Sequence, residues 1–167
     1  MKKLILFALP IILLLSGCAS SDRTGNFQIY LKDQPIDADE ILVTISEISV
    51  QKKDEGFLTI WSGEETYDLL KLQKKEEKII DITLEAGTYT QIRLVVTAGQ
   101  IVITGKSNDM VVPSSEVKIP VVFNVIKGSV TEILLDFEAE HSIHVVNAGQ
   151  SEQYILRPVI RVENISY

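Results

Sequence analysis

The stretch that decides the fold is Glu116-Val117-Lys118-Ile119-Pro120-Val121-Val122-Phe123-Asn124-Val125. It has the longest regular alternation in the chain, with an apolar residue at every odd position from 117 to 125. Successive side chains of a strand point to opposite faces, so the odd face is predicted to be buried. Pro120 lies on the other face and cannot donate a ladder hydrogen bond. We therefore expect an edge position or a bulge there.

The same period of two recurs from Asn26 onward. It covers the segments 27–31, 41–45, 80–84, 92–96, 133–139 and 154–162. The phase slips between Ile45 and Ile48, which predicts a bulge near Ser46-Glu47. About ten short strands with frequent turn signals, and no sustained 3.6-residue period after Leu15, predict an all-β domain. We expect an antiparallel two-sheet β-sandwich, either immunoglobulin-like or transthyretin-like.

Three connecting regions lack clear alternation. Residues 57–61 are predicted to form only a short strand after the turn-like 53–56, and residues 147–153 to form a loop. Residues 71–78 are mostly charged, with Leu72 the only apolar residue. They are predicted to form a solvated loop with room for one helical turn.

The N-terminus has the pattern of an export signal. Lys2 and Lys3 precede an apolar run from Leu4 to Leu15, which leads into Ser16-Gly17-Cys18. As a helix this run rises only about 18 Å, too short for a bilayer core about 30 Å thick. Its end resembles the lipobox of bacterial lipoproteins. That resemblance implies cleavage before Cys18 and fatty acylation, for example by palmitate, of the new N-terminal cysteine. The alternative is an ordinary secretory signal with an incidental cysteine.

The predicted domains follow from this signal. Residues 1–17 form the signal peptide, 18–25 the lipidated Cys18 with a short tether, and 26–167 a single β-sandwich domain. Seven small and polar residues, 19–25, reach at most about 25 Å. Two or more acyl chains hold a protein stably at a membrane. Since Cys18 is the only cysteine, no intrachain disulfide can form. We expect lipid anchoring on the extracytoplasmic side of the cell membrane or outer membrane.

The charge balance bears on partners. The sequence has 16 basic and 23 acidic residues, and loss of Lys2 and Lys3 leaves 14 basic residues and a net charge of −9. An acidic domain is a poor binder of nucleic acid, so no nucleic-acid partner is expected. The residue after the lipobox cysteine is Ala19 rather than aspartate. In Gram-negative lipoproteins this difference favours the outer membrane.

Several blocks of sequence, in a fixed order, carry a family resemblance. They are Lys32-Asp33-Gln34-Pro35, Tyr67-Asp68-Leu69-Leu70-Lys71-Leu72, Ala86-Gly87-Thr88-Tyr89-Thr90-Gln91-Ile92-Arg93-Leu94, Val112-Pro113-Ser114-Ser115, Leu135-Asp136-Phe137-Glu138-Ala139 with Ser142-Ile143, and Tyr154-Ile155-Leu156-Arg157-Pro158-Val159-Ile160-Arg161. From Gly25 to Glu163 the chain resembles the bacterial family called domain of unknown function 4382. The resemblance implies a β-sandwich, often lipid-anchored or secreted. It implies no catalytic residues.

Two groups of residues are candidates for binding. Asp33, Asp37, Asp39 and Glu40 crowd one loop, and clustered carboxylates suit a hard cation such as calcium. An unshifted thermal transition at millimolar calcium would exclude that site. The second group is an outward-facing patch for a glycan, peptide or anion, formed by Tyr30, Arg93, Arg157 and Arg161.

No catalytic motif emerges from the remaining polar residues. Asp136, Glu138 and Glu140 alternate and are expected on one exposed strand face, although paired carboxylates can hydrolyse glycosides. His141 and His144 are three apart and therefore fall on opposite strand faces, which does not suit a zinc site. We expect a non-catalytic binding or structural module of the cell envelope, whose partner is an envelope protein or a glycan, with no cofactor beyond the lipid on Cys18. The alternatives are a calcium-dependent adhesive module and an exported hydrolase.

Overall fold

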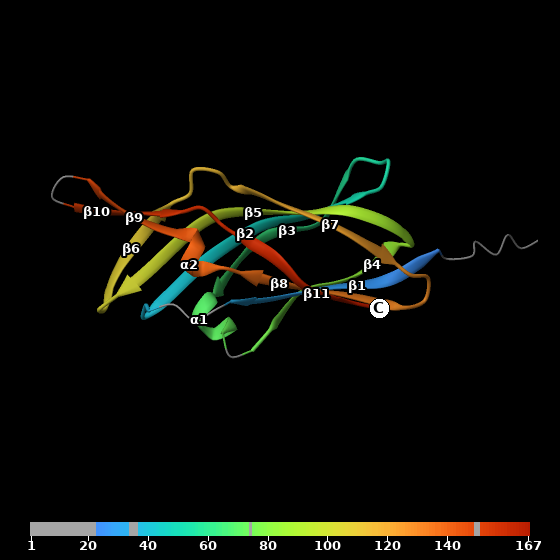
Figure 1. Cartoon of the computed structure of the whole chain (residues 1–167), viewed down its shortest axis with the longest axis horizontal. Coiled ribbons are helices and arrows are strands. Elements are labelled where there is room, and N and C mark those ends of the chain that lie inside the picture. Colours follow the sequence, from blue (N-terminus) through green and yellow to red (C-terminus); the bar gives the residue numbers. More distant parts are fainter. Residues whose placement is uncertain (1–22, 34–36, 74, 149–150) are drawn as a thin grey trace, which may run out of the picture.

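The computed structural model describes residues 23–33, 37–73, 75–148 and 151–167. The predicted signal peptide and Cys18 lie outside these residues, as do positions 34–36 of the predicted cation loop. The described chain forms two β-sheets packed face to face, with two single-turn helices, α1 (Leu69–Leu72) and α2 (Ala139–Ser142) (Figure 1). None of the helices within these residues is both long and apolar enough to cross a bilayer.

The smaller sheet has four strands in the order β11-β8-β1-β4. Their bounds are β1 (Thr24–Asp33), β4 (Glu77–Glu85), β8 (Val130–Phe137) and β11 (Ile160–Ser166). The β1–β4 and β8–β11 pairs are antiparallel, whereas β1 and β8 run parallel. Phe27, Ile29 and Leu31 are fully buried, so the other face of β1 points outward.

The larger sheet is built around the 17-residue strand β5 (Gly87–Ile103). Its other strands are β2 (Glu40–Lys52), β3 (Phe57–Asp68), β6 (Lys106–Val111), β7 (Glu116–Val125), β9 (Ile143–Ala148) and β10 (Ser151–Leu156). One side of β5 pairs with β2 along its length. On the other side β7 pairs with its first half and β6 with its second. The sheet continues through a parallel β6–β10 pair to β9 at the edge.

The all-β, two-sheet sandwich predicted from the alternation is confirmed. Most strand pairs are antiparallel as predicted, and β1–β8 and β6–β10 are the parallel ones. Alternation shows which face of a strand is buried. The same alternation arises whether the neighbouring strand runs parallel or antiparallel. Strand direction follows from long connections that bring distant segments together, and no local pattern marks them.

An aromatic stack joins the two sheets. The ring centroid of Phe123 on β7 lies 5.1 Å from that of Phe27 on β1 and 5.2 Å from that of Tyr89 on β5. All three side chains are almost completely buried. The Tyr89 hydroxyl donates a hydrogen bond of 2.9 Å to the carbonyl oxygen of Glu85, so its polar end is satisfied within the core.

Both predicted irregularities are present. The register of β2 shifts between Ile45 and Glu47 against both neighbouring strands, which confirms the bulge at Ser46-Glu47. In the described residues β7 pairs only with β5 and is an edge strand. Its register shifts beside Pro120, where three steps on β7 match two on β5. The proline is thus tolerated because no second neighbour needs its missing N–H.

Four boundary predictions need correction. The segment 154–162, predicted to share one strand face, is divided between β10, which ends at Leu156, and β11, which begins at Ile160, and these strands belong to different sheets. Strand β3 runs on to Asp68, well past residue 61, although residues 62–66 are exposed and polar. This edge strand is held by backbone hydrogen bonds to β2 rather than by burial of its side chains. It can therefore form without the apolar alternation that would have marked it in the sequence. The 147–153 region is mainly the end of β9 and the start of β10. The helical turn predicted within 71–78 lies slightly earlier, at Leu69–Leu72, and β4 already begins at Glu77.

Candidate binding site

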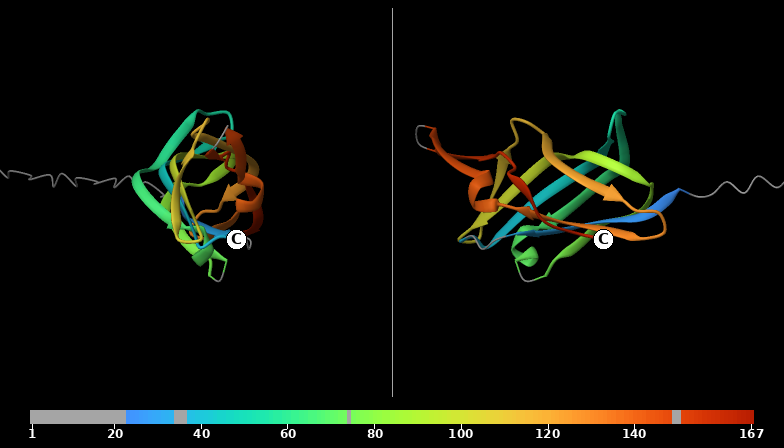
Figure 2. Two further views of the ribbon diagram at one scale, coloured as in Figure 1. Left: turned by 90° about the vertical axis from the view of Figure 1, so that its left-hand side faces the viewer. Right: turned by 45° about the vertical axis from the view of Figure 1, so that its right-hand side comes forward.

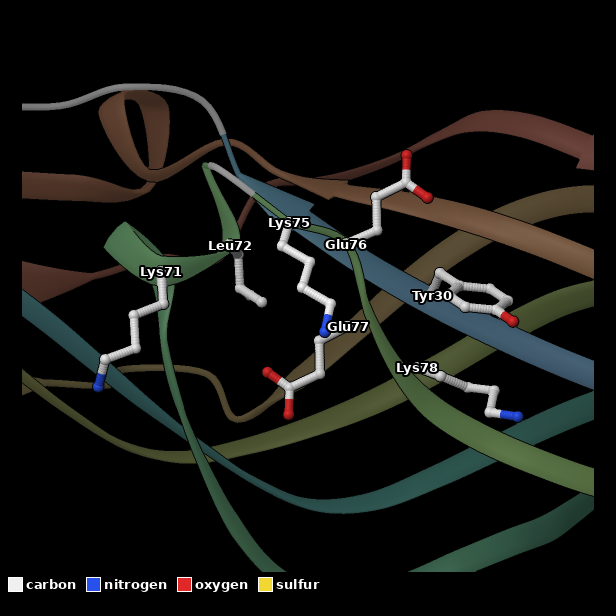
Figure 3. Close-up of a pocket in the computed structure, with 7 residues that line it drawn as sticks. All are labelled: Tyr30, Lys71, Leu72, Lys75, Glu76, Glu77 and Lys78. Atoms are coloured by element: carbon white, nitrogen blue, oxygen red, sulfur yellow. The ribbon is translucent and has the colours of Figure 1, made fainter.

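Tyr30 lines a hollow of about 430 Å³ beside the smaller sheet, called here the Tyr30 pocket. Its lining residues are Tyr30, Lys71, Leu72, Lys75, Glu76, Glu77 and Lys78. Figure 3 shows Tyr30 and Lys78 on one side, Lys71 and Leu72 from α1 on the other, and Lys75 and Glu77 between them. The pocket therefore combines the outer face of β1, the start of β4 and the α1–β4 connection.

Strand alternation and register place Tyr30 there. Its neighbours Ile29 and Leu31 point into the core, so the tyrosine ring must face outward. The β1–β4 register shifts between Ile29 and Tyr30, which sets Tyr30 opposite Lys78 rather than Ile79. Because of this shift the ring lies next to the long lysine side chain at the mouth of the pocket.

A row of polar side chains continues from Tyr30 across the outer face of the smaller sheet. The Tyr30 hydroxyl donates to Gln28 Oε1 at 3.0 Å, and Gln28 Nε2 donates to Asp81 Oδ2 at 3.3 Å. Asn26 Nδ2 donates to Asp81 Oδ1 at 3.0 Å, and Lys78 forms an ion pair with the same carboxylate. The hydrogen bonds from Lys78 and Asn26 lower the pKa of Asp81 below its ordinary value.

The opposite wall is the single turn of α1. Asp68 caps the turn, since its Oδ1 accepts a hydrogen bond of 3.1 Å from the Leu70 N–H. The Asp68 carboxylate also holds Lys71, with 3.0 Å between Nζ and Oδ2. Leu72 is buried and forms the apolar part of the lining. The cap and the ion pair stabilise the turn itself, and its buried Leu69 and Leu72 hold it against the core.

The charges around the Tyr30 pocket nearly balance. Three lysines and two glutamates line it. Lys71 and Lys78 are each paired with an aspartate, Asp68 and Asp81 respectively. A strongly charged ligand gains little here, because each added charge meets groups of both signs. A polar ligand with an apolar face fits better, since it can stack on the tyrosine ring and exchange hydrogen bonds with the surrounding groups.

The four residues of the predicted patch fall into two separate regions. Tyr30 and Arg161 lie on the outer face of the smaller sheet, with β8 between their strands. Arg93 lies on the outer face of the larger sheet. The structure therefore does not form a single patch from them. The prediction that each of these side chains faces outward is correct. The sequence, however, carried no information on which sheet each strand would join.

Glu116 forms an ion pair with Arg93 and lines the same hollow as Arg157. Arg93 Nη1 lies 3.0 Å from Glu116 Oε2, and its guanidinium carbon lies 3.7 Å from the ring centroid of Phe57. The hollow, called here the Arg157 pocket, has a volume of about 300 Å³ and is also lined by Pro113, Ser114, Val117 and Pro158. This pocket brings together two of the sequence blocks that carry the family resemblance.

Two of the four residues of the predicted cation loop, Asp33 and Asp39, accept hydrogen bonds from the backbone of distant segments. Buried Asp33 accepts the Ala139 N–H at 3.1 Å through Oδ1, which joins β1 to α2. Asp39 accepts the Gly105 N–H at 2.8 Å through Oδ2, and Asp37 is exposed. Glu40 is partly buried at the start of β2. In the parts of the chain that the structure describes, no three His, Cys, Asp or Glu side chains are grouped to hold a metal ion.

The expectation of three carboxylates on one exposed strand face is wrong. Strand β8 ends at Phe137, and Glu140 lies on α2. Asp136 and Glu138 are only 6% and 7% exposed. The register sets Asp136 between Lys32 and Arg161, long side chains that can cover it. Glu138 Oε1 lies 2.8 Å from Arg161 Nη1, and its Oε2 lies 3.2 Å from His141 Nδ1.

Sequence reasoning missed most of the Tyr30 pocket. Lys71, Lys75, Glu76, Glu77 and Lys78 belong to the stretch that was predicted to be a solvated loop with room for one helical turn, and not to line a binding site. Asp68, a capping residue before Leu69 and Leu70, was the signal that the helical turn begins earlier, at Leu69. Nothing local, however, indicated that this turn packs beside β1, which lies far away in the sequence.

Comparison with known proteins gives one family. Residues 24–158 match the family described as "Domain of unknown function (DUF4382)". This range runs from the first residue of β1 through the connection after β10 and includes both pockets. No curated protein and no solved structure matches the chain. The match covers well over half of the sequence, and the chain therefore belongs to the DUF4382 family.

Proposed function

We propose that this protein is a lipid-anchored, non-catalytic module on the extracytoplasmic side of the cell envelope that binds a glycan in the Tyr30 pocket. The observation that carries the proposal is the position of Tyr30. Its ring lines a pocket of about 430 Å³ and adjoins a row of hydrogen-bonding side chains. Pockets of roughly 300–1,000 Å³ are typical of sites for small ligands.

The chemistry of the pocket suits a sugar. A pyranose has one face rich in C–H groups, which can pack on the Tyr30 ring, and hydroxyls at its edge that donate and accept hydrogen bonds. Gln28, Asn26 and Asp81 offer planar donors and acceptors along the same sheet face. The nearly balanced charge of the lining favours a neutral or zwitterionic ligand over a polyanion.

The place of the domain relative to Cys18 determines how far from the membrane a lipid anchor would hold it. Strand β1 begins at Thr24, six positions after Cys18. Such a short connection would hold the sandwich next to the membrane, at a distance of at most about 20 Å from the acylated sulfur. Mass spectrometry of the native protein tests this part. We expect a chain that starts at Cys18 and carries acyl groups, whereas an intact Met1 or an unmodified thiol contradicts the anchor.

The glycan proposal predicts a specific loss of binding. Replacing Tyr30 by alanine removes the stacking surface and should raise the Kd for soluble peptidoglycan fragments about tenfold, or about 1.4 kcal/mol. Isothermal titration calorimetry with the full chain measures this change. Arg157→Ala alters the other pocket and serves as the matched control, with an unchanged Kd. A loss of affinity in the arginine variant alone would place the site in the Arg157 pocket instead.

A further inference from the structure

The loop between β7 and β8 is bonded directly to the residues where the chain enters the sandwich. The Gly128 N–H donates to the Thr24 carbonyl oxygen at 2.9 Å, and the Asn26 N–H donates to the Ser129 carbonyl oxygen at 2.9 Å. Figures 1 and 2 show this loop, in orange, beside the blue start of β1 at one end of the molecule. These two hydrogen bonds hold the loop beside the entry point of the chain.

This end of the sandwich exposes apolar side chains. Ile126 is 44% exposed and Val130 is 43% exposed, with the exposed Lys127 between them. Tyr167 is also exposed and lies near Val130. The preceding residue, Ser166, pairs with Glu132 in the antiparallel β8–β11 ladder, and Glu132 is two residues after Val130. We call Ile126, Lys127, Val130 and Tyr167 the tether-end surface. Aliphatic, lysine and tyrosine side chains together suit a membrane interface, where apolar groups enter the acyl boundary and polar ends stay with the headgroups.

The length of the N-terminal connection indicates what this surface meets. From Cys18 to Thr24 the chain spans at most about 20 Å. If Cys18 is acylated, the end of the sandwich that contains Thr24 is held within that distance of the lipid. Exposed apolar residues also occur on other strands, namely Phe57 and Leu58 on β3, Val122 on β7, Val111 on β6, and Val145 and Val146 on β9. Strand β9 lies at the opposite end of the sandwich (Figure 1). Among the exposed apolar groups that the structure describes, only the tether-end surface adjoins the residues where the chain enters the sandwich.

We propose that the tether-end surface docks into the headgroup region of the anchoring membrane and sets the orientation of the sandwich. This inference rests on the lipid anchor of the proposed function. Interfacial segments bury apolar side chains about 5–10 Å deep in this region. The chain advances about 20 Å along β1 from Thr24 to Tyr30. The docked orientation therefore presents the Tyr30 pocket away from the bilayer.

A single-cysteine labelling experiment tests the docking. Because Cys18 is the only native cysteine and is acylated under the proposal, Ile126→Cys introduces one free thiol. The full acylated chain, labelled there with an environment-sensitive fluorophore, is placed in phosphatidylcholine vesicles that contain nitroxide lipids. The matched control is Lys106→Cys, an exposed residue of β6 at the far end of the sandwich. We expect blue-shifted, quenched emission at position 126 and neither change at position 106.

The outcomes separate the docking from the anchor. If the chain stays with the vesicles and both labels remain in water, the docking is overturned while the anchor stands. A chain without acyl groups overturns the anchor and, with it, the docking. A second variant, Ile126→Asn with Val130→Asn, carries its label on Tyr167→Cys. It should remain bound to the vesicles but lose the blue shift that the same label shows with Ile126 and Val130 in place.

Discussion

Replacing Phe123 by alanine is expected to lower the free energy of unfolding by about 3–5 kcal/mol. The ring is fully buried and is stacked between Phe27 of one sheet and Tyr89 of the other. Its removal takes away buried apolar area and leaves a cavity that two rings held in different sheets cannot easily fill. Domains of this size are stable by only about 5–15 kcal/mol, so the loss is a large fraction of the total.

Chemical denaturation followed by circular dichroism measures this loss. Val122→Thr is the matched control, because Val122 is the preceding residue on β7 and is 67% exposed. Threonine keeps the branched shape that strands favour, so this variant should change stability by no more than about 0.5 kcal/mol. Equal effects of the two substitutions would show that the Phe123 stack does not hold the sheets together.

Replacing Gly25 by alanine is expected to lower the free energy of unfolding by about 3 kcal/mol, the upper end of the cost of overpacking. A Cβ atom at this position would lie 2.3 Å from the carbonyl oxygen of Ile126 and 3.0 Å from Val125 Cγ1. The first contact is with backbone that is tied by hydrogen bonds to β1, so relief requires the loop or the strand to shift. The glycine is thus needed for close approach of two backbones.

Gly56→Ala provides the control for the glycine prediction. No atom lies within 4 Å of a Cβ built there, and its backbone is outside the left-handed region. Alanine should leave stability unchanged or raise it by up to about 1 kcal/mol, since it restricts the unfolded chain. Thermal unfolding of both variants compares them directly. A Gly25→Ala protein as stable as the Gly56→Ala protein would contradict the close approach of Gly25 and Ile126.

Strand alternation predicted the core with good accuracy. Phe27, Ile29 and Leu31, and likewise Ile133 and Leu135, were assigned inward from a period of two and are fully buried. The bulge at Ser46-Glu47 also followed from the sequence, because a change of phase must be absorbed where it occurs. These features depend only on residues that are neighbours along the chain.

The candidate site was predicted less well. Tyr30 was identified because it faces outward, but its pocket depends on α1 and the start of β4 packing beside β1. Asp136 and Glu138 were expected to be solvated on the evidence of their own strand. Lys32 and Arg161 come beside Asp136 from two other strands, and Arg161 also pairs with Glu138. Burial of a polar group depends on what covers it, and the covering residues here are distant in sequence.

The sequence by itself determined the all-β class, the buried face of the main strands and the bulge at Ser46-Glu47, because these depend on local alternation. It also determined the family, because ordered blocks of residues identify it. Only the tertiary structure decided the order and direction of the strands, the division of Tyr30, Arg93, Arg157 and Arg161 between two regions, and the apolar end beside Thr24. The physical reason is that alternation encodes which side of a strand is apolar, whereas the choice of neighbour depends on the packing of all strands at once.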